Sequence, residues 1–166
     1  STTFSETLRV GWSSSETEAL ALAWNFFEEE DYSQARQIFS ELWQSHPDNH
    51  EVKTGFGNTL LWLGVQALEA KDYFAAEEDL LQSLDLYPGT GFSGHVLVAM
   101  YLETGRVQEA HPLVINLMES FPENSNLFFL GAKVAFLRGD FELAVTRISR
   151  ALELRPNWIE AQRLSE

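Results

Sequence analysis

The sequence contains no cysteine, which excludes a disulfide framework and a thiolate-based site, and which leaves both the cytosol and the bacterial periplasm open as compartments. Basic residues are scarce, because 11 lysines and arginines stand against 25 aspartates and glutamates, for a formal net charge of −14. Nucleic acids and anionic membrane surfaces are bound through basic footprints, so this composition argues against both as partners. No apolar run reaches the length of a membrane span, and we therefore expect no direct membrane insertion.

The ends of the sequence carry no targeting pattern. It begins at Ser1 without an initiator methionine or a signal peptide, and it stops at Glu166 just inside a new helical pattern. We therefore expect a processed or excised piece of a longer protein.

The acidic charge is concentrated in the first part of the chain. Residues 1–100 hold 16 acidic and 4 basic side chains, whereas residues 101–166 hold 9 and 7. A basic partner would be drawn by long-range attraction to the first part, although a net negative charge also serves solubility.

The clearest local pattern lies at residues 60–88 and predicts two short helices joined by a tight turn. Apolar residues recur at helical spacing on both sides of Lys71 and Asp72, and Asp72 is placed to cap the second helix. The small residues Gly64 and Ala76 lie where two helices would approach closely. A hairpin of this length is marginal alone, so the pattern predicts stacked neighbours.

The same pattern occurs four times. In each copy an alanine lies twelve residues before a proline, and a large apolar residue lies four positions after the alanine. The prolines of the four copies are 41, 34 and 34 residues apart. The alanine and proline pairs are Ala35 and Pro47, Ala76 and Pro88, Ala110 and Pro122, and Ala144 and Pro156.

This pattern resembles the tetratricopeptide repeat, a helix–turn–helix unit of about 34 residues with the signature W-x2-L-G-x2-Y, A-x3-F, P. The second copy, for example, reads Leu60-x2-Leu63-Gly64-x2-Ala67, then Ala76-x3-Leu80 and Pro88. The resemblance implies an all-α, right-handed solenoid of four helical hairpins plus a C-terminal helix. We divide the chain into an N-terminal segment, 1–15, four repeats, 16–48, 49–90, 91–123 and 124–156, and a capping helix or start of a further repeat, 157–166.

Three details of the repeats lead to local predictions. Ser13 and Glu16 are spaced as a capping box for the first repeat helix. The seven extra residues before the second repeat predict a longer first helix there, with a break at Gly55 and Gly57 as the alternative. One extra residue in the fourth repeat predicts a local bulge before Gly139.

Motifs that could support catalysis lack the necessary context. The G-x-G-x-x-G pattern at residues 89–94 follows a predicted helix rather than a strand, so we interpret it as a turn between repeats and not as a dinucleotide site. His46 and His50 have Pro47 between them and do not share a helix face. We therefore expect no catalytic residue, no cofactor and no metal site, and we expect that the protein is not an enzyme.

The resemblance also implies a concave surface lined by the first helix of each repeat, which in this family commonly binds peptides. The lysines with which chaperone-binding members grip acidic tails are missing here. Glutamates instead recur at one edge beside an apolar floor, which suits a basic or amphipathic partner segment. The partner-binding candidates are Leu20, Trp24, Phe27, Glu28, Asn58, Leu61, Val65, Glu69, Phe92, His95, Glu103 and Phe128.

We therefore predict a non-catalytic scaffold for protein–protein interaction, and three alternatives remain open. Residues 1–15 could themselves cover the groove. The chain could self-assemble into a homo-oligomer, as a dimer or head to tail, with Arg147, Arg150 and Arg155 meeting the acidic first third. It also resembles periplasmic repeat arrays of bacterial exopolysaccharide export and envelope assembly systems. The sequence does not identify the partner.

Overall fold

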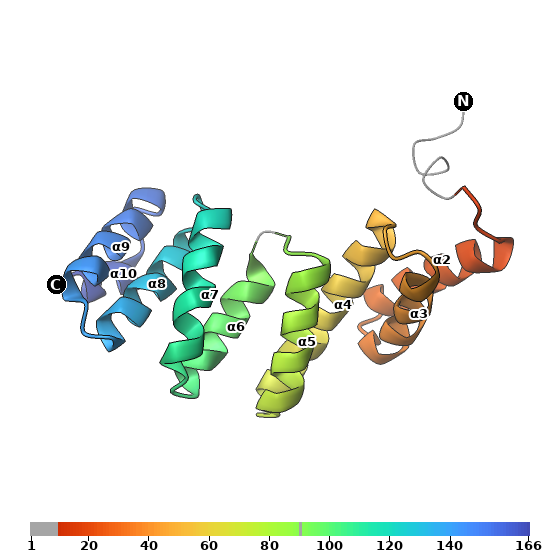
Figure 1. Ribbon diagram of the computed structural model, residues 1–166, viewed down its shortest axis with the longest axis horizontal. Coiled ribbons are helices and arrows are strands. Elements are labelled where there is room, and N and C mark those ends of the chain that lie inside the picture. Colours follow the sequence, from red (N-terminus) through yellow and green to blue (C-terminus); the bar gives the residue numbers. More distant parts are fainter. Residues whose placement is uncertain (1–9, 90) are drawn as a thin grey trace. The chain divides into compact units, whose positions relative to one another are not determined.

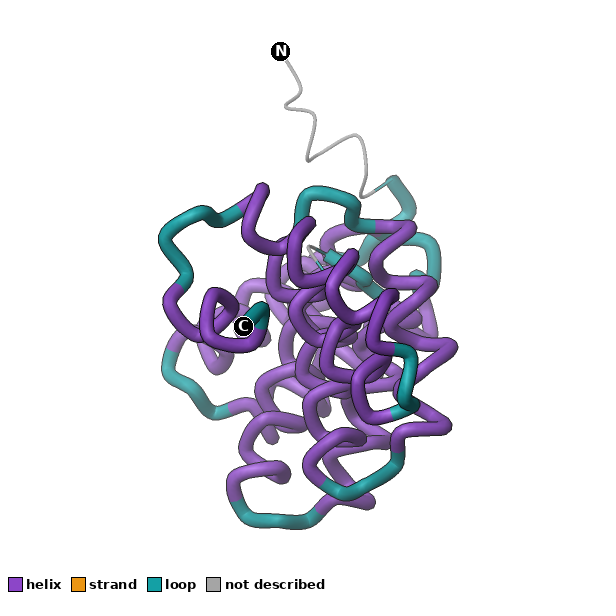
Figure 2. The backbone as a smooth tube through the Cα atoms, turned by 90° about the vertical axis from the view of Figure 1, so that its left-hand side faces the viewer, coloured by secondary structure: helices purple, strands orange, loops and turns teal. Residues whose placement is uncertain are grey.

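The computed structural model describes residues 10–89 and 91–166, and all regular structure in them is α-helical (Figure 1). The helices are joined by short loops (Figure 2). The chain divides into two compact units, unit 1 at Ser1–Tyr87 and unit 2 at Pro88–Glu166. Unit 1 holds α2 (Ser14–Glu28), α3 (Tyr32–Ser45), α4 (His50–Glu69) and α5 (Tyr73–Leu86), and unit 2 holds α6 (Phe92–Glu103), α7 (Val107–Ser120), α8 (Ser125–Leu137), α9 (Phe141–Leu154) and α10 (Ile159–Leu164).

Each hairpin closes through the same kind of turn. Between α4 and α5 the amide of Asp72 donates to the carbonyl oxygen of Ala67 at 2.8 Å, and the amide of Lys71 donates to that of Leu68 at 2.9 Å. This pair of bonds is a Schellman motif, which requires a left-handed residue. Asp72 then caps α5 by accepting from the amide of Ala75 at 3.1 Å, which confirms its predicted role. The left-handed residues of the four turns are Glu30, Lys71, Gly105 and Gly139, with φ of 61°, 59°, 74° and 81°.

Unit 1 stacks the α2–α3 hairpin on the α4–α5 hairpin around one apolar core. Gly64 lets α4 and α5 approach closely, because a Cβ at Gly64 would lie 2.7 Å from Cγ of Leu80 and 3.4 Å from the carbonyl oxygen of Ala76. The predicted close approach of Gly64 and Ala76 is therefore confirmed. The buried core comprises Leu20, Ala23, Ala35, Phe39, Leu42, Val52, Phe56, Leu60 and Leu86.

Helix α4 is 20 residues long and runs without interruption through both of its early glycines. The longer helix is thus confirmed, and the alternative of a break is wrong. Packing explains the glycines. The ring of Phe39 occupies the space of a Cβ at Gly55, and a Cβ at Gly57 would lie 2.7 Å from Cβ of Tyr87. The buried hydroxyl of Ser83 also donates to the carbonyl oxygen of Gly57 at 2.7 Å.

In unit 2, α6 and α7 pack against α8, α8 packs against α9, and α9 packs against α10. Two glycines inside its helices again lie at close contacts, since Leu117 occupies the space beside Gly94 and Met118 the space beside Gly131. The predicted bulge before Gly139 is wrong, because α8 is a regular α-helix through Leu137. The extra residue instead makes the helix one residue longer, so its hydrogen bonds stay continuous. Each added residue rotates a helix by about 100°, and the earlier residues of α8 are therefore rotated by that angle relative to the loop that follows.

Candidate functional site

Four aromatic side chains of unit 1 form a continuous row. Trp24 and Phe27 on α2 meet edge to face with ring centroids 5.5 Å apart, and Phe27 meets Tyr32 at 5.4 Å. Tyr32, the first residue of α3, stacks nearly parallel to Trp62 of α4 at 6.4 Å. At the other end Trp24 contacts Phe39 of the core at 5.2 Å. We call Trp24, Phe27, Tyr32 and Trp62 the aromatic row.

Local structure explains why these four residues meet. Trp24 and Phe27 are three residues apart and therefore share one face of α2. The tight turn after α2 folds the chain back and places Tyr32 beside that face, while α4 packs against both helices of the first hairpin. Trp62 is 38% exposed and the other three are half-buried. The row thus runs from the core to the solvent.

An acidic rim adjoins the aromatic row. Glu28, Glu29 and Glu30 follow Phe27 directly and are exposed. Burial raises the pKa of Tyr32, and the negative charge of Glu30 raises this pKa further, which places Glu30 within electrostatic reach of the row. Unit 1 carries 16 acidic and only 4 basic side chains. A cationic group would therefore be attracted to this surface.

The partner-binding residues predicted in unit 1 differ in how far they are exposed to solvent. Leu20 and Leu61 are only 1% and 6% exposed, so these two are core residues and are not available to a partner. Asn58 and Val65 are half-buried on α4, and Glu69 is exposed near its end. Trp62 lies between Asn58 and Val65 at helical spacing and is exposed, whereas the residue predicted from the sequence at this point was its neighbour Leu61. The spacing of Asn58, Trp62, Val65 and Glu69 along one helix face was the signal that could have found it.

The candidates of unit 2 form a smaller cluster. Phe92, which is 44% exposed, stacks on His95 with ring centroids 6.2 Å apart. Burial lowers the pKa of His95, and the positive charge of Lys133 lowers it further. Glu103 is exposed at the end of α6, and Phe128 is half-buried at the start of α8. The structure thus brings Phe92 and His95 together, and their charged neighbour is basic rather than acidic.

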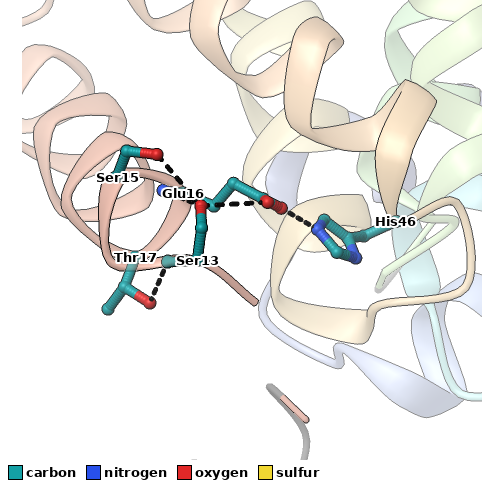
Figure 3. A network of polar contacts seen from close by, with 5 residues as sticks. All are labelled: Ser13, Ser15, Glu16, Thr17 and His46. Atoms are coloured by element: carbon teal, nitrogen blue, oxygen red, sulfur yellow. Dashed lines mark hydrogen bonds and ion pairs between the residues drawn. The ribbon is translucent and has the colours of Figure 1, made fainter. Parts of the chain in front are cut away.

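The first helix of unit 1 is held by a polar network that includes His46 (Figure 3). Ser13 Oγ accepts from the amide of Glu16 at 3.1 Å and donates to Glu16 Oε1 at 3.0 Å. The second carboxylate oxygen contacts His46 Nε2, and the imidazole stacks on Trp12 at 4.2 Å. These contacts confirm the predicted cap. They also give His46 a packing role at the end of α3.

Residues 10–89 and 91–166 show no group of three side chains that could hold a metal ion, and no helix there is long and apolar enough to cross a membrane. The glycine-rich pattern follows α5, and Gly91, with φ of 87°, is the N-cap of α6. Thr90 and the proposed covering segment up to residue 9 lie outside the described residues.

The comparisons agree with this architecture. The tetratricopeptide repeat model matches residues 19–49. Among solved structures, MamA AMB-1 is 22% identical over 90% of this chain and 84% of that chain, with a TM-score of 0.59. MamA 41-end from Desulfovibrio magneticus RS-1 is 14% identical over 92% and 82%, with a TM-score of 0.64. The Arabidopsis OM64 TPR domain is 16% identical over 68% and 93%, with a TM-score of 0.63. No curated protein matches the sequence.

The chain is thus a helical-repeat protein of the solenoid class. It contains a tetratricopeptide repeat at residues 19–49 and has the fold of tetratricopeptide repeat proteins over most of its length. The resemblance and the all-α fold class inferred from the sequence are both confirmed.

Proposed function

We propose that this protein is a polypeptide-binding scaffold and that unit 1 holds a basic or amphipathic segment against the aromatic row. The main support for this proposal is the aromatic row, in which four rings contact one another beside exposed carboxylates. Apolar surface of this kind next to solvent is typical of binding sites.

The chemistry of the surface favours a cationic amphipathic partner. Aromatic rings offer a large and rigid apolar surface, and their faces attract lysine and arginine side chains. Glu28 and Glu30 beside Phe27 and Tyr32, with Glu69 at the end of α4, add long-range attraction for the same side chains. An acidic segment would be repelled by this rim.

The test compares three synthetic peptides that share one apolar pattern and are basic, neutral or acidic, titrated against the full chain by tryptophan fluorescence and calorimetry. We expect the basic peptide to bind most tightly, and Trp62→Ala to weaken its binding by about tenfold or more. Trp62 is a better target than Trp24, because Trp24 contacts the core residue Phe39. Phe74→Ala on α5, a side chain that is 80% exposed, is the matched control.

A second variant tests the charge. Glu28→Lys combined with Glu30→Lys changes only exposed side chains, and it should weaken binding of the basic peptide at low salt more than at high salt. Equal affinity for all three peptides, or binding that Trp62→Ala leaves unchanged, would contradict the proposal.

The alternative of head-to-tail assembly through basic residues of unit 2 finds less support. Arg147 is half-buried and donates to the carbonyl oxygen of Gly131 at 2.9 Å. Arg150 lies 3.1 Å from a carboxylate oxygen of Glu153, and Arg155 lies over the ring of Trp158 at 4.7 Å. All three cations therefore have neighbours within their own unit. The resemblance to periplasmic repeat arrays of exopolysaccharide export systems stays a prediction.

A further inference from the structure

Tyr32 and Trp62, at the solvent end of the aromatic row, have nearly parallel ring planes. The planes differ by only 15°, and the ring centroids are 6.4 Å apart. The other contacts within the row are edge to face, with planes 80° apart for Trp24 and Phe27 and 65° apart for Phe27 and Tyr32. Trp62 is also 38% exposed. A flat group of a partner can therefore lie parallel to both rings at this end of the row.

A carboxylate adjoins the same two rings. Glu30 is exposed and lies within electrostatic reach of Tyr32. Arg36, one helical turn after Tyr32 on α3, forms an ion pair with Asp79 at 3.2 Å, so its charge is already balanced within unit 1. The site thus combines parallel aromatic faces with a negative charge that attracts a cation.

Arginine fits this combination better than lysine does. The guanidinium is planar, so it can place its face on an aromatic ring while the N–H groups at its edge donate to a carboxylate. The lysine ammonium has no plane and is more strongly hydrated.

Unit 2 shows the arginine mode within the chain itself. The guanidinium of Arg106 lies over the ring of Tyr101 at 4.6 Å, and its Nε donates to a carboxylate oxygen of Glu109 at 3.1 Å. Arg155 covers the ring of Trp158 in a similar way, at 4.7 Å. An arginine that uses its face and its edge at once is therefore a contact that this chain already makes.

We infer that unit 1 recognises its partner through an arginine side chain, an inference that rests on the proposed function of the aromatic row. The guanidinium lies on the exposed face of Trp62 beside Tyr32, and its edge donates to the carboxylate of Glu30. Lysine at the same position of the partner makes the charge contact without the flat one. The row thus selects arginine within a basic or amphipathic segment.

The test is calorimetric titration of the full chain with three basic amphipathic peptides that differ at one central position. This position is arginine, lysine or citrulline, and citrulline keeps the planar group of arginine but has no charge. We expect the arginine peptide to bind about fivefold or more tightly than the lysine peptide, although their charges are equal. The citrulline peptide should also bind more weakly than the arginine peptide.

Variants of the chain separate the ring from the charge. Trp62→Leu keeps an apolar side chain without an aromatic face, so the arginine and lysine peptides should bind it equally, whereas Trp62→Phe should keep the preference. Glu30→Gln should weaken binding of the arginine peptide more than that of the citrulline peptide. Glu41→Gln, at an exposed carboxylate of α3, is the matched control and should change neither.

The outcomes distinguish this inference from the proposed function. Equal affinity for the arginine and lysine peptides, with binding that still depends on Trp62, would overturn the selection of arginine and leave the scaffold function standing. A preference for arginine that survives Trp62→Leu would overturn it too, because the guanidinium would then be bound elsewhere. Self-association of the chain that Trp62→Leu abolishes would mean that a second copy occupies the row instead. Absence of binding for all three peptides would overturn both proposals.

Discussion

Arg36 on α3 and Asp79 on α5 form an ion pair at 3.2 Å that ties the second helices of the two hairpins in unit 1 together. The Asp79 side chain is 9% exposed, whereas that of Arg36 is 43% exposed. Burial raises the pKa of Asp79 above its ordinary value of 3.8, the charge of Arg36 opposes this rise, and that of Glu78 adds to it. The guanidinium is thus the group that makes an ionised Asp79 tolerable at this position.

Arg36→Met should therefore destabilise the protein in a pH-dependent way. The variant loses the opposing charge, so the pKa of Asp79 rises further in the folded state. A folded-state pKa above the unfolded value makes stability fall as pH rises through that window. We expect a loss of about 1–2 kcal/mol at pH 7 that shrinks toward pH 4, since one partner is largely solvated. Urea denaturation at both pH values measures it.

The control for this prediction is Arg150→Met, which removes a cation from exposed pairs with Glu123 and Glu153. It should cost less than about 1 kcal/mol, with little dependence on pH. A loss for Arg36→Met that is equal at pH 7 and pH 4 would show that Arg36 acts through packing of its stem alone.

The left-handed turn positions offer a stabilising change. Lys71 and Glu30 hold φ near +60° at a cost that glycine does not have, whereas Gly105 and Gly139 already fill the same turn position. Lys71→Gly should raise the free energy of unfolding by up to about 1 kcal/mol. Gly139→Ala should lower it by a similar amount. Thermal and urea unfolding of the two variants should therefore shift in opposite directions.

The sequence predicted the features that depend on neighbours along the chain. Asp72 caps α5 as predicted, because a cap needs only a short side chain next to the first turn, and Asp31 and Asp140 cap α3 and α9 in the same way in the structure. The repeat pattern likewise predicted the hairpins, since the same turn and the same small residues recur at each close contact.

The exposure of a side chain that depends on the exact rotation of its helix was predicted less well. Leu61 and Trp62 are adjacent in sequence, yet one is in the core and the other is exposed, and repeat spacing alone does not resolve a difference of about 100°. Tyr32 joins the aromatic row only because the turn folds back over α2. A cavity in unit 2 is lined by Phe136 of α8, Phe141 of α9 and Leu164 of α10, so no pattern of neighbours along the chain marks it.

The carboxylate of Glu16 leads to a prediction for mildly acidic pH. Its hydrogen bond with His46 lowers the pKa of Glu16 below the ordinary value of 4.5, with smaller contributions from Ser13. A lowered folded-state pKa contributes stability above the unfolded value, and this contribution is lost as pH falls through the folded value. Glu16→Gln should therefore lower the melting temperature at pH 7 and have progressively less effect below pH 4.5.

The matched control is Glu18→Gln on the same helix, an exposed carboxylate. It should change the melting temperature little at either pH. If Glu16→Gln behaves like Glu18→Gln at pH 7, the contact with His46 does not hold α2 in place.

The contact between Gly64 and Leu80 can be tested by a double-mutant cycle. A methyl group at Gly64 would lie 2.7 Å from Cγ of Leu80, so Gly64→Ala should destabilise by about 1–3 kcal/mol, although alanine favours helix. Leu80→Ala alone creates a cavity and should cost about 2–5 kcal/mol. Because the added methyl group fills part of that cavity, the double variant should be more stable than the sum of the two losses predicts, by about 1 kcal/mol or more. Additive losses in urea denaturation would mean that α4 and α5 move apart to accommodate the methyl group.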